Sequence, residues 1–172
     1  MLKEIATLLG KSLASNLAES FMDNVLKKRV TPAVGSVVYC ELVFDMASHS
    51  GVYVGDNRIV HLDGSGKIEI VSAKEFLKRL DGFNSAISIY VSCKDSVPVG
   101  SEEIAKRALD MAGNSLDYNL VFNNCHKFTS GCVTGDFDNS DIILEKLKSK
   151  VNLKIGADNW LVWETQDGEY IS

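Results

Sequence analysis

The 172-residue sequence has no long apolar run, no CxxC pair and no extended stripe of basic residues. Because a membrane-spanning helix needs about 20 consecutive apolar residues, the sequence predicts no such helix. The four cysteines, at positions 40, 93, 125 and 132, lack the spacing of a zinc finger, so we expect no metal and no cofactor. The N-terminus lacks a basic region followed by an unbroken apolar stretch, and we therefore expect a cytoplasmic protein with four reduced thiols.

The charge balance is mildly acidic, with 18 Lys and Arg against 23 Asp and Glu and a net charge of −5. Nothing gathers the basic residues into a stripe that could follow phosphates, so we expect no nucleic-acid partner. The apolar share of 45% and the charged share of 24% are typical of a globular chain. The length suits one domain with a sizeable core.

Two kinds of hydrophobic pattern divide the chain. Apolar residues at helical spacing predict an amphipathic helix over residues 2–28, which Thr31-Pro32 ends. We expect it to pack on its own domain, and binding to a membrane surface or a partner helix is the alternative. From Gly35 to Tyr90, short β-branched and aromatic runs between turn residues predict strands instead.

The predicted elements add up to one α+β domain. Strands are predicted at 36–44, 50–54, 58–62, 67–71 and 86–91, with a short helix at 72–80 that Ser72 caps. Further helices are predicted from Ser101, as the cap, to Gly113, from about 124 to 135, and over 141–150. The tail, 151–172, is predicted to be extended or irregular.

Two of the three histidines, His49 and His61, lie in one predicted hairpin. A two-residue loop at Asp56-Asn57 would pair Val52 with His61 and put the two imidazoles on opposite faces. A three-residue loop would pair Gly51 with His61 and make the imidazoles diagonal neighbours on one face. A shared function for the two histidines therefore predicts an odd loop or a β-bulge.

Cys125 follows two asparagines that are good helix caps, which places its thiol in the first turn of a helix. There the positive end of the helix dipole stabilises a thiolate, and backbone N–H groups can bind an oxyanion. Cys125, Phe128 and Cys132 share a helix face that we expect to lie on the sheet. His126 points about a hundred degrees away, so we expect it outside the site.

A thiol at a helix start and a strand histidine that can take its proton form a nucleophile–base pair, which a second histidine can orient. Cys125, His49 and His61 are therefore the candidate catalytic residues. A cysteine facing a core is more often a small buried hydrophobe, and we assign Cys40, Cys93 and Cys132 to that class.

Two blocks of the sequence resemble a known family. PAVGSVVYCELVFDMASHSGVYVGDNRIVHLDG is similar to the histidine box of lecithin:retinol acyltransferase-like proteins, and YNLVFNNCHKFTSGCVTG to their Asn-Cys box. The blocks span about residues 32–64 and 100–135, in the family's order and spacing. The chain departs from the pattern in having Asn-Cys-His-Lys-Phe where the family usually has Asn-Cys-Glu-His-Phe, and in having Ala47 two residues before His49.

The resemblance implies a circularly permuted papain-like fold of the NlpC type, with an antiparallel sheet packed on helices. It implies that Cys125 is the nucleophile, His49 the general base and His61 the residue that orients the base. Asn124 and Tyr118 are the candidates for positioning and oxyanion binding. The implied divisions are an amphipathic helix at 1–30, the thiol enzyme domain at 31–150 and an extended tail packed on it at 151–172.

The implied activity is acyl transfer through a Cys thioester, as a phospholipase or acyltransferase. The expected partner is an acyl-bearing small molecule or phospholipid, with residues 1–28 as a peripheral contact to the membrane surface. Two alternatives stay open, namely an amidase or cysteine peptidase of the wider papain-like group, and a non-enzymatic module that keeps the fold.

Overall fold

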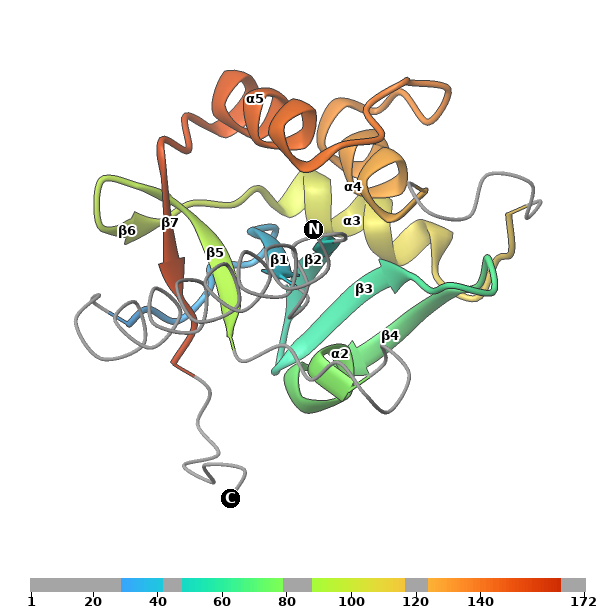
Figure 1. Cartoon of the computed structure of the whole chain (residues 1–172), viewed down its shortest axis with the longest axis horizontal. Helices are drawn as coiled ribbons and strands as arrows, with labels where there is room; N and C mark the ends of the chain where they lie inside the picture. Colours follow the sequence, from blue (N-terminus) through green and yellow to red (C-terminus); the bar gives the residue numbers. More distant parts are fainter. Residues whose placement is uncertain (1–28, 42–47, 79–87, 117–123, 165–172) are drawn as a thin grey trace, which may run out of the picture.

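The computed structural model describes residues 29–41, 48–78, 88–116 and 124–164 (Figure 1). The helix predicted over 2–28 lies outside these residues. Within them, seven strands form one antiparallel sheet in the order β4-β3-β2-β1-β5-β6, and β7 pairs with β5. Their bounds are β1 Val37–Glu41, β2 Ser48–Gly55, β3 Arg58–Leu62, β4 Ile68–Ser72, β5 Ile89–Lys94, β6 Val97–Pro98 and β7 Asn159–Val162.

Helices cover both faces of the sheet. One face carries α3 (Glu102–Met111), α4 (Asn124–Thr134) and α5 (Leu144–Ile155), whereas the short α2 (Ala73–Lys78) lies on the other (Figure 1). Because successive strand residues face opposite ways, β1 contributes to two cores: Val37 and Tyr39 pack under α3–α5, and Val38 and Cys40 pack on the α2 side. The α+β architecture predicted from the sequence is therefore confirmed.

Two predicted helix caps can be compared with the structure. Ser72 and Glu75 form a reciprocal capping box at the start of α2, as the cap prediction requires. Ser101 occupies the N-cap position of α3 but its hydroxyl makes no capping bond, so the predicted side-chain cap there is wrong. Gly113 ends α3 with a φ of +86°.

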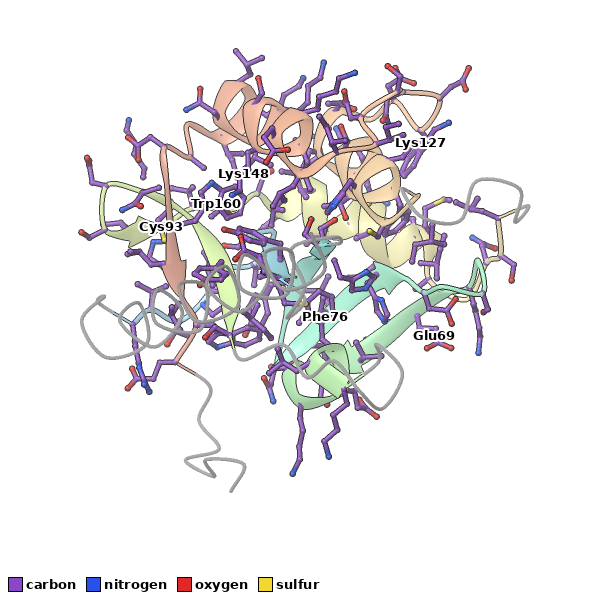
Figure 2. All side chains as sticks on the ribbon, in the orientation of Figure 1. Glu69, Phe76, Cys93, Lys127, Lys148 and Trp160 are labelled. Atoms are coloured by element: carbon purple, nitrogen blue, oxygen red, sulfur yellow. The ribbon has the colours of Figure 1, made fainter. Side chains whose placement is uncertain are left out.

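The C-terminal part of the chain is more ordered in secondary structure than its sequence indicated. Helix α5 begins at Leu144 and continues to Ile155, past the predicted end at residue 150, and Gly156 then ends it in the left-handed conformation. Beyond it, β7 adds to the sheet beside β5. Lys148 of α5 lies over the ring of Tyr39 and beside Trp160 of β7, which ties these elements together (Figure 2).

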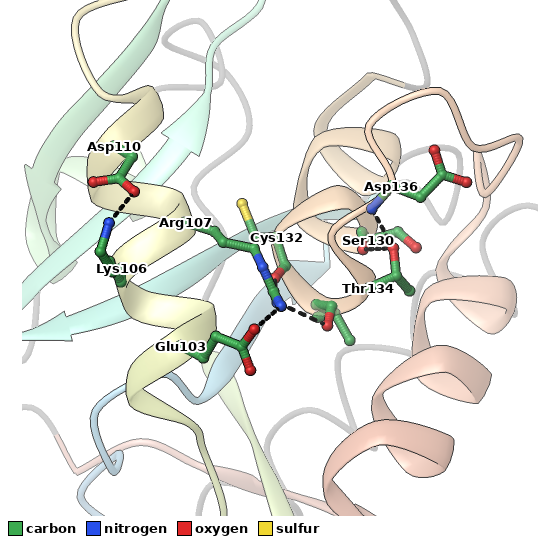
Figure 3. Close-up of polar contacts among 9 residues, drawn as sticks. Glu103, Lys106, Arg107, Asp110, Ser130, Cys132, Thr134 and Asp136 are labelled. Carbon is green, nitrogen blue, oxygen red and sulfur yellow. Dashed lines mark hydrogen bonds and ion pairs between the residues drawn. The ribbon is translucent and has the colours of Figure 1, made fainter.

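An arginine of α3 holds the end of α4 in place. Arg107 Nη1 donates to the carbonyls of Cys132 and Val133 at 2.9 and 3.3 Å, and Nη2 pairs with Glu103 (Figure 3). These carbonyls belong to the last turn of α4, where the dipole is negative and carbonyls lack helical partners. The contact fixes the axis of the helix whose first turn carries Cys125.

Candidate active site

The β2–β3 hairpin brings His49 and His61 onto one face by a β-bulge. Asp56 and Asn57 both have positive φ, 51° and 57°, and so form the two-residue turn that pairs Gly55 with Arg58. The register then shifts between Tyr53 and Gly55, so that Tyr53 pairs with Ile59 and Val52 with Val60. This shift places His61 beside Gly51, diagonally across from His49, and confirms the predicted bulge.

The two imidazoles are hydrogen-bonded and buried. His49 Nε2 lies 2.8 Å from His61 Nδ1, with the ring planes at 87°. His61 is fully buried and His49 is 8% exposed. Phe76 of α2 contacts both rings, at centroid distances of 5.0 and 5.5 Å (Figure 2). The sheet, the bulge and Phe76 thus hold the His49 ring in one orientation.

The close approach of β2 and β3 at this pair requires a glycine at position 51. A Cβ atom there would lie 2.7 Å from Ile59 Cγ2, 2.8 Å from the Val60 carbonyl oxygen and 3.2 Å from His61 Cβ. We expect Gly51→Ala to lower the free energy of unfolding by about 2 kcal/mol or more, because backbone as well as side-chain atoms of β3 must move. Urea denaturation measures the loss.

Gly113→Ala is the matched control for this change. Gly113 has a positive φ, but a Cβ atom at this position would meet no other atom within 4 Å, so alanine there costs only the backbone strain of about 1 kcal/mol. Equal losses in the Gly51 and Gly113 variants would contradict the steric account of the hairpin.

Cys125 is the second residue of α4, and its sulfur lies against β2. Cys125 Sγ is 3.8 Å from the Ser48 carbonyl oxygen. The Tyr53 backbone groups bond toward β1, so by alternation those of Ser48 and Ser50 face β3. The pairing of β2 with β3 starts at Val52 and Val60. The Cys125 sulfur lies beside the earlier part of β2, where no β3 residue is paired with the strand.

Cys40 is the cross-strand partner of His49 in the β1–β2 pair. Burial raises the pKa of Cys40 to about 12, so this residue is a protonated thiol of the core.

The thiol of Cys125 is protonated in this environment. Burial raises its pKa above the ordinary value, while hydrogen bonds from the backbone and hydroxyl of Ser50 and from the backbone of His126 act in the opposite direction. Desolvation therefore outweighs the stabilisation of a thiolate by the helix start, although the backbone N–H groups there act in the expected direction. Nucleophilic attack by Cys125 requires a base.

The other three cysteines differ from Cys125 in exposure. Cys40, Cys93 and Cys132 are buried core residues, as predicted, and Cys125 alone among the four is partly exposed. All four are thiols. Within residues 29–41, 48–78, 88–116 and 124–164, no group of three or more His, Cys, Asp or Glu side chains could hold a metal ion.

The position predicted for His126 is wrong. Its side chain is 4% exposed and points at β2, with Nε2 2.9 Å from Ser48 Oγ and Nδ1 2.8 Å from Ser50 Oγ. The helical-wheel argument assumed one buried face, but α4 lies between the sheet, α3 and α5 and is buried on most sides. The His126 side chain, a hundred degrees around the helix from Cys125, therefore still contacts protein and not solvent.

Burial of His126 predicts a pH-dependent stability. Burial lowers its pKa from 6.5 to about 4, with Glu145 and Lys148 of α5 acting in opposite directions. As the pH falls, the imidazole of the unfolded chain therefore binds a proton near pH 6.5, whereas the imidazole of the folded chain binds one only near pH 4. We expect the free energy of unfolding to lose nothing from His126 above pH 6.5 and to fall by about 3 kcal/mol as the pH drops toward 4.

Urea denaturation from pH 4 to 7.5 tests this expectation, with His126→Asn as the comparison. The variant has no imidazole at this position, so the slope of stability against pH between 4 and 6.5 should flatten. An unchanged slope would assign the acid sensitivity to other groups.

The two remaining candidates are less well defined. Asn124 is the first residue of α4, in agreement with a helix start at this point. Tyr118 lies outside the described residues. Sequence reasoning missed Ser48, Ser50 and Thr129, whose buried hydroxyls join α4 to β2. A run of small polar residues on both sides of His49 was the only signal for them.

These features define an α+β protein in which a helix-start cysteine lies against a strand that carries one of two paired histidines. The chain belongs to the lecithin retinol acyltransferase family, whose sequence profile matches residues 31–138. A relative is the human protein phospholipase A and acyltransferase 2, which is 30% identical over 97 residues. The match covers 48% of this chain and 60% of the human protein. No helix in the described part of the chain is long and apolar enough to cross a membrane.

Proposed function

We propose that this chain is a thiol-dependent acyl-transfer enzyme that acts on lipid acyl esters through a Cys125 thioester. The observation that carries the proposal is the position of the Cys125 sulfur, 3.8 Å from the carbonyl oxygen of Ser48. That residue precedes His49, whose ring is hydrogen-bonded to His61. Family membership and the name of the human relative support acyl transfer as the reaction class and lipid esters as the substrate class.

His49 is the general base in this mechanism. Its Nε2 atom is engaged with His61 Nδ1, so Nδ1 of His49 takes the thiol proton. The imidazolium that forms is stabilised by donation from Nε2–H to His61 Nδ1. Because burial keeps the Cys125 thiol protonated, proton transfer and attack on the carbonyl occur together on substrate binding.

The acyl group then passes through two tetrahedral intermediates. The sulfur forms a bond to the ester carbonyl carbon, and the backbone N–H groups at the start of α4 stabilise the oxyanion, with Asn124 and Tyr118 as positioning residues. The leaving alkoxide takes the proton from His49 and departs. Water, or an acceptor hydroxyl or amine, loses a proton to His49, attacks the thioester and regenerates the thiol.

The proposal includes the fold relationship and the domain division. His49 precedes Cys125 in the chain, the reverse of the order in papain-like enzymes, which supports a circularly permuted papain-like domain over 31–150. Residues 151–164, which hold the end of α5 and strand β7, complete it as a segment packed on the domain. The helix predicted at 1–30 would contact the membrane surface or the domain.

A substrate comparison tests the proposed function. We expect the full chain to release fatty acid and lysophospholipid from vesicles of phosphatidylcholine, a neutral lipid chosen because the net charge of −5 disfavours anionic surfaces. Cleavage of peptide substrates without fatty acid release would instead favour an amidase or peptidase. Loss of both activities would favour a non-enzymatic module.

A further inference from the structure

The imidazole of His126 joins the helix that carries Cys125 to the strand that carries His49. Its two nitrogens contact the hydroxyls of Ser48 and Ser50 at 2.9 and 2.8 Å. These serines flank His49 in sequence, and alternation along β2 puts their side chains on the face opposite the His49 ring. One buried side chain therefore binds both neighbours of His49, and its own neighbour is Cys125.

Counting protons gives the direction of each hydrogen bond in this cluster. Thr129 Oγ1 donates to the Cys125 carbonyl at 2.8 Å, because a carbonyl can only accept. Thr129 then has no proton left, so Ser50 Oγ, 3.1 Å away, donates to it while Cys125 is a thiol; the one Ser50 proton would turn to the sulfur only if Cys125 became a thiolate. Ser50 in turn accepts from His126 Nδ1–H. In the neutral ring Nε2 is the acceptor, and Ser48 Oγ–H donates to it.

The surroundings of the ring match this neutral tautomer. The strand presents the hydroxyls of Ser48 and Ser50 to it, and α5 presents one charge of each sign, Glu145 and Lys148. Burial holds the pKa of His126 at about 4, so the ring carries no charge at neutral pH. The hydrogen bonds that run from Ser48 through His126, Ser50 and Thr129 to the Cys125 carbonyl therefore all form between neutral groups.

We propose that His126 is a positioning residue that fixes the Cys125 thiol against β2 and so sets its relation to His49. His126 does not touch the reacting atoms in this role; it acts through Ser48 and Ser50 on one side and through its peptide link to Cys125 on the other. The catalytic part of this inference rests on the proposed function. A displacement of about 1 Å between a nucleophile and its base can cost about 100-fold in rate, so both contacts matter.

Two variants of the full chain separate the hydrogen bonds of His126 from its volume. His126→Leu fills the site but removes both bonds to β2. His126→Asn puts a side-chain N–H near the Nδ1 position, where it can still donate to Ser50. We expect kcat on phosphatidylcholine vesicles to fall at least about tenfold in the leucine variant with KM within about twofold, and to recover in the asparagine variant.

The pH midpoint of Cys125 alkylation by iodoacetamide gives a readout that needs no acyl substrate. Peptide mass spectrometry separates Cys125 from the other thiols. Release of Cys125 from β2 should lower the thiol pKa toward its ordinary value, because burial is what raises it. We therefore expect a lower midpoint and faster labelling in His126→Leu, although the same variant turns over ester more slowly. His126→Asn should keep the wild-type midpoint.

Ser130→Ala is the matched control on the same helix. Ser130 is buried and donates to Asp141 Oδ2 at 2.6 Å, so alanine also removes a buried hydrogen bond of α4. It should change stability without moving the alkylation midpoint or kcat. An equal shift in the control, or a His126→Leu midpoint equal to that of the wild type, would overturn the inference. A wild-type chain without acyl transfer but with the midpoint shift would refute the proposed function and support the positioning role.

Discussion

Cys125→Ala is expected to reduce ester turnover by at least about 10⁴-fold, because removal of a nucleophile that forms a covalent intermediate eliminates the pathway rather than slowing it. Cys125→Ser should lose a similar factor, since the hydroxyl is a far weaker nucleophile under the same base. Steady-state release of fatty acid from phosphatidylcholine vesicles measures the rate. Intact-protein mass spectrometry after rapid quenching measures the acyl-enzyme, which should be missing in both variants.

Cys132→Ala is the control for this prediction. Cys132 lies seven residues along the same helix, is fully buried in the core under α3–α5 and has a pKa raised to about 12 by burial. Its alanine variant should remain acylated and active, with only a modest loss of stability. Ester turnover in Cys125→Ala above about one hundredth of the wild-type rate would remove Cys125 from the nucleophile role.

The strand and helix positions were largely predictable because they depend on local patterns. Alternation and turn residues located β2, β3 and β4, and cap residues located the starts of α2 and α4. The two-residue β6 carries too few side chains to show any pattern. The end of α5 was missed because Val151 and Ile155 continue the helical period past residue 150, into the tail that was predicted to be extended or irregular.

The histidine pair shows what one sequence can and cannot determine. The even spacing of His49 and His61 established that a bulge or an odd loop was needed for a shared face. The spacing could not decide between a bulge and an odd loop. That choice depends on the backbone conformation of Asp56 and Asn57 in the turn and on whether Val54 is paired or bulged. The shared face was therefore predicted on condition of a bulge or an odd loop, and the structure shows the bulge.

His126 is the opposite case, in which a local rule gave the wrong result. A helical wheel separates Cys125 from His126 correctly by angle, but it contains no information about how many neighbours surround the helix. With the sheet, α3 and α5 all packed on α4, the polar side chain had to be buried with partners. Residues 48 and 50 supply them only because they lie on the opposite strand face from His49.

The second large effect is expected for His49, and its comparison with His61 separates the base from the residue that orients it. His49→Asn should lower kcat by about 10²–10⁴-fold, because the variant removes the proposed general base. His61→Asn should cost less, about tenfold, since its amide can still accept from His49 Nε2–H and the base survives.

Both histidines are buried against Phe76, so each variant must be assayed as folded protein, with circular dichroism and urea denaturation as the check. The acyl-enzyme gives the sharper readout: formation of the thioester should be slowed in His49→Asn in proportion to kcat, because the base acts in the acylation step. A His61 variant that loses as much activity as the His49 variant, or more, would reverse the two roles. The two roles can be separated because a 2.8 Å hydrogen bond connects the two rings, so that loss of the base itself and loss of the residue that orients it through this bond should differ in cost.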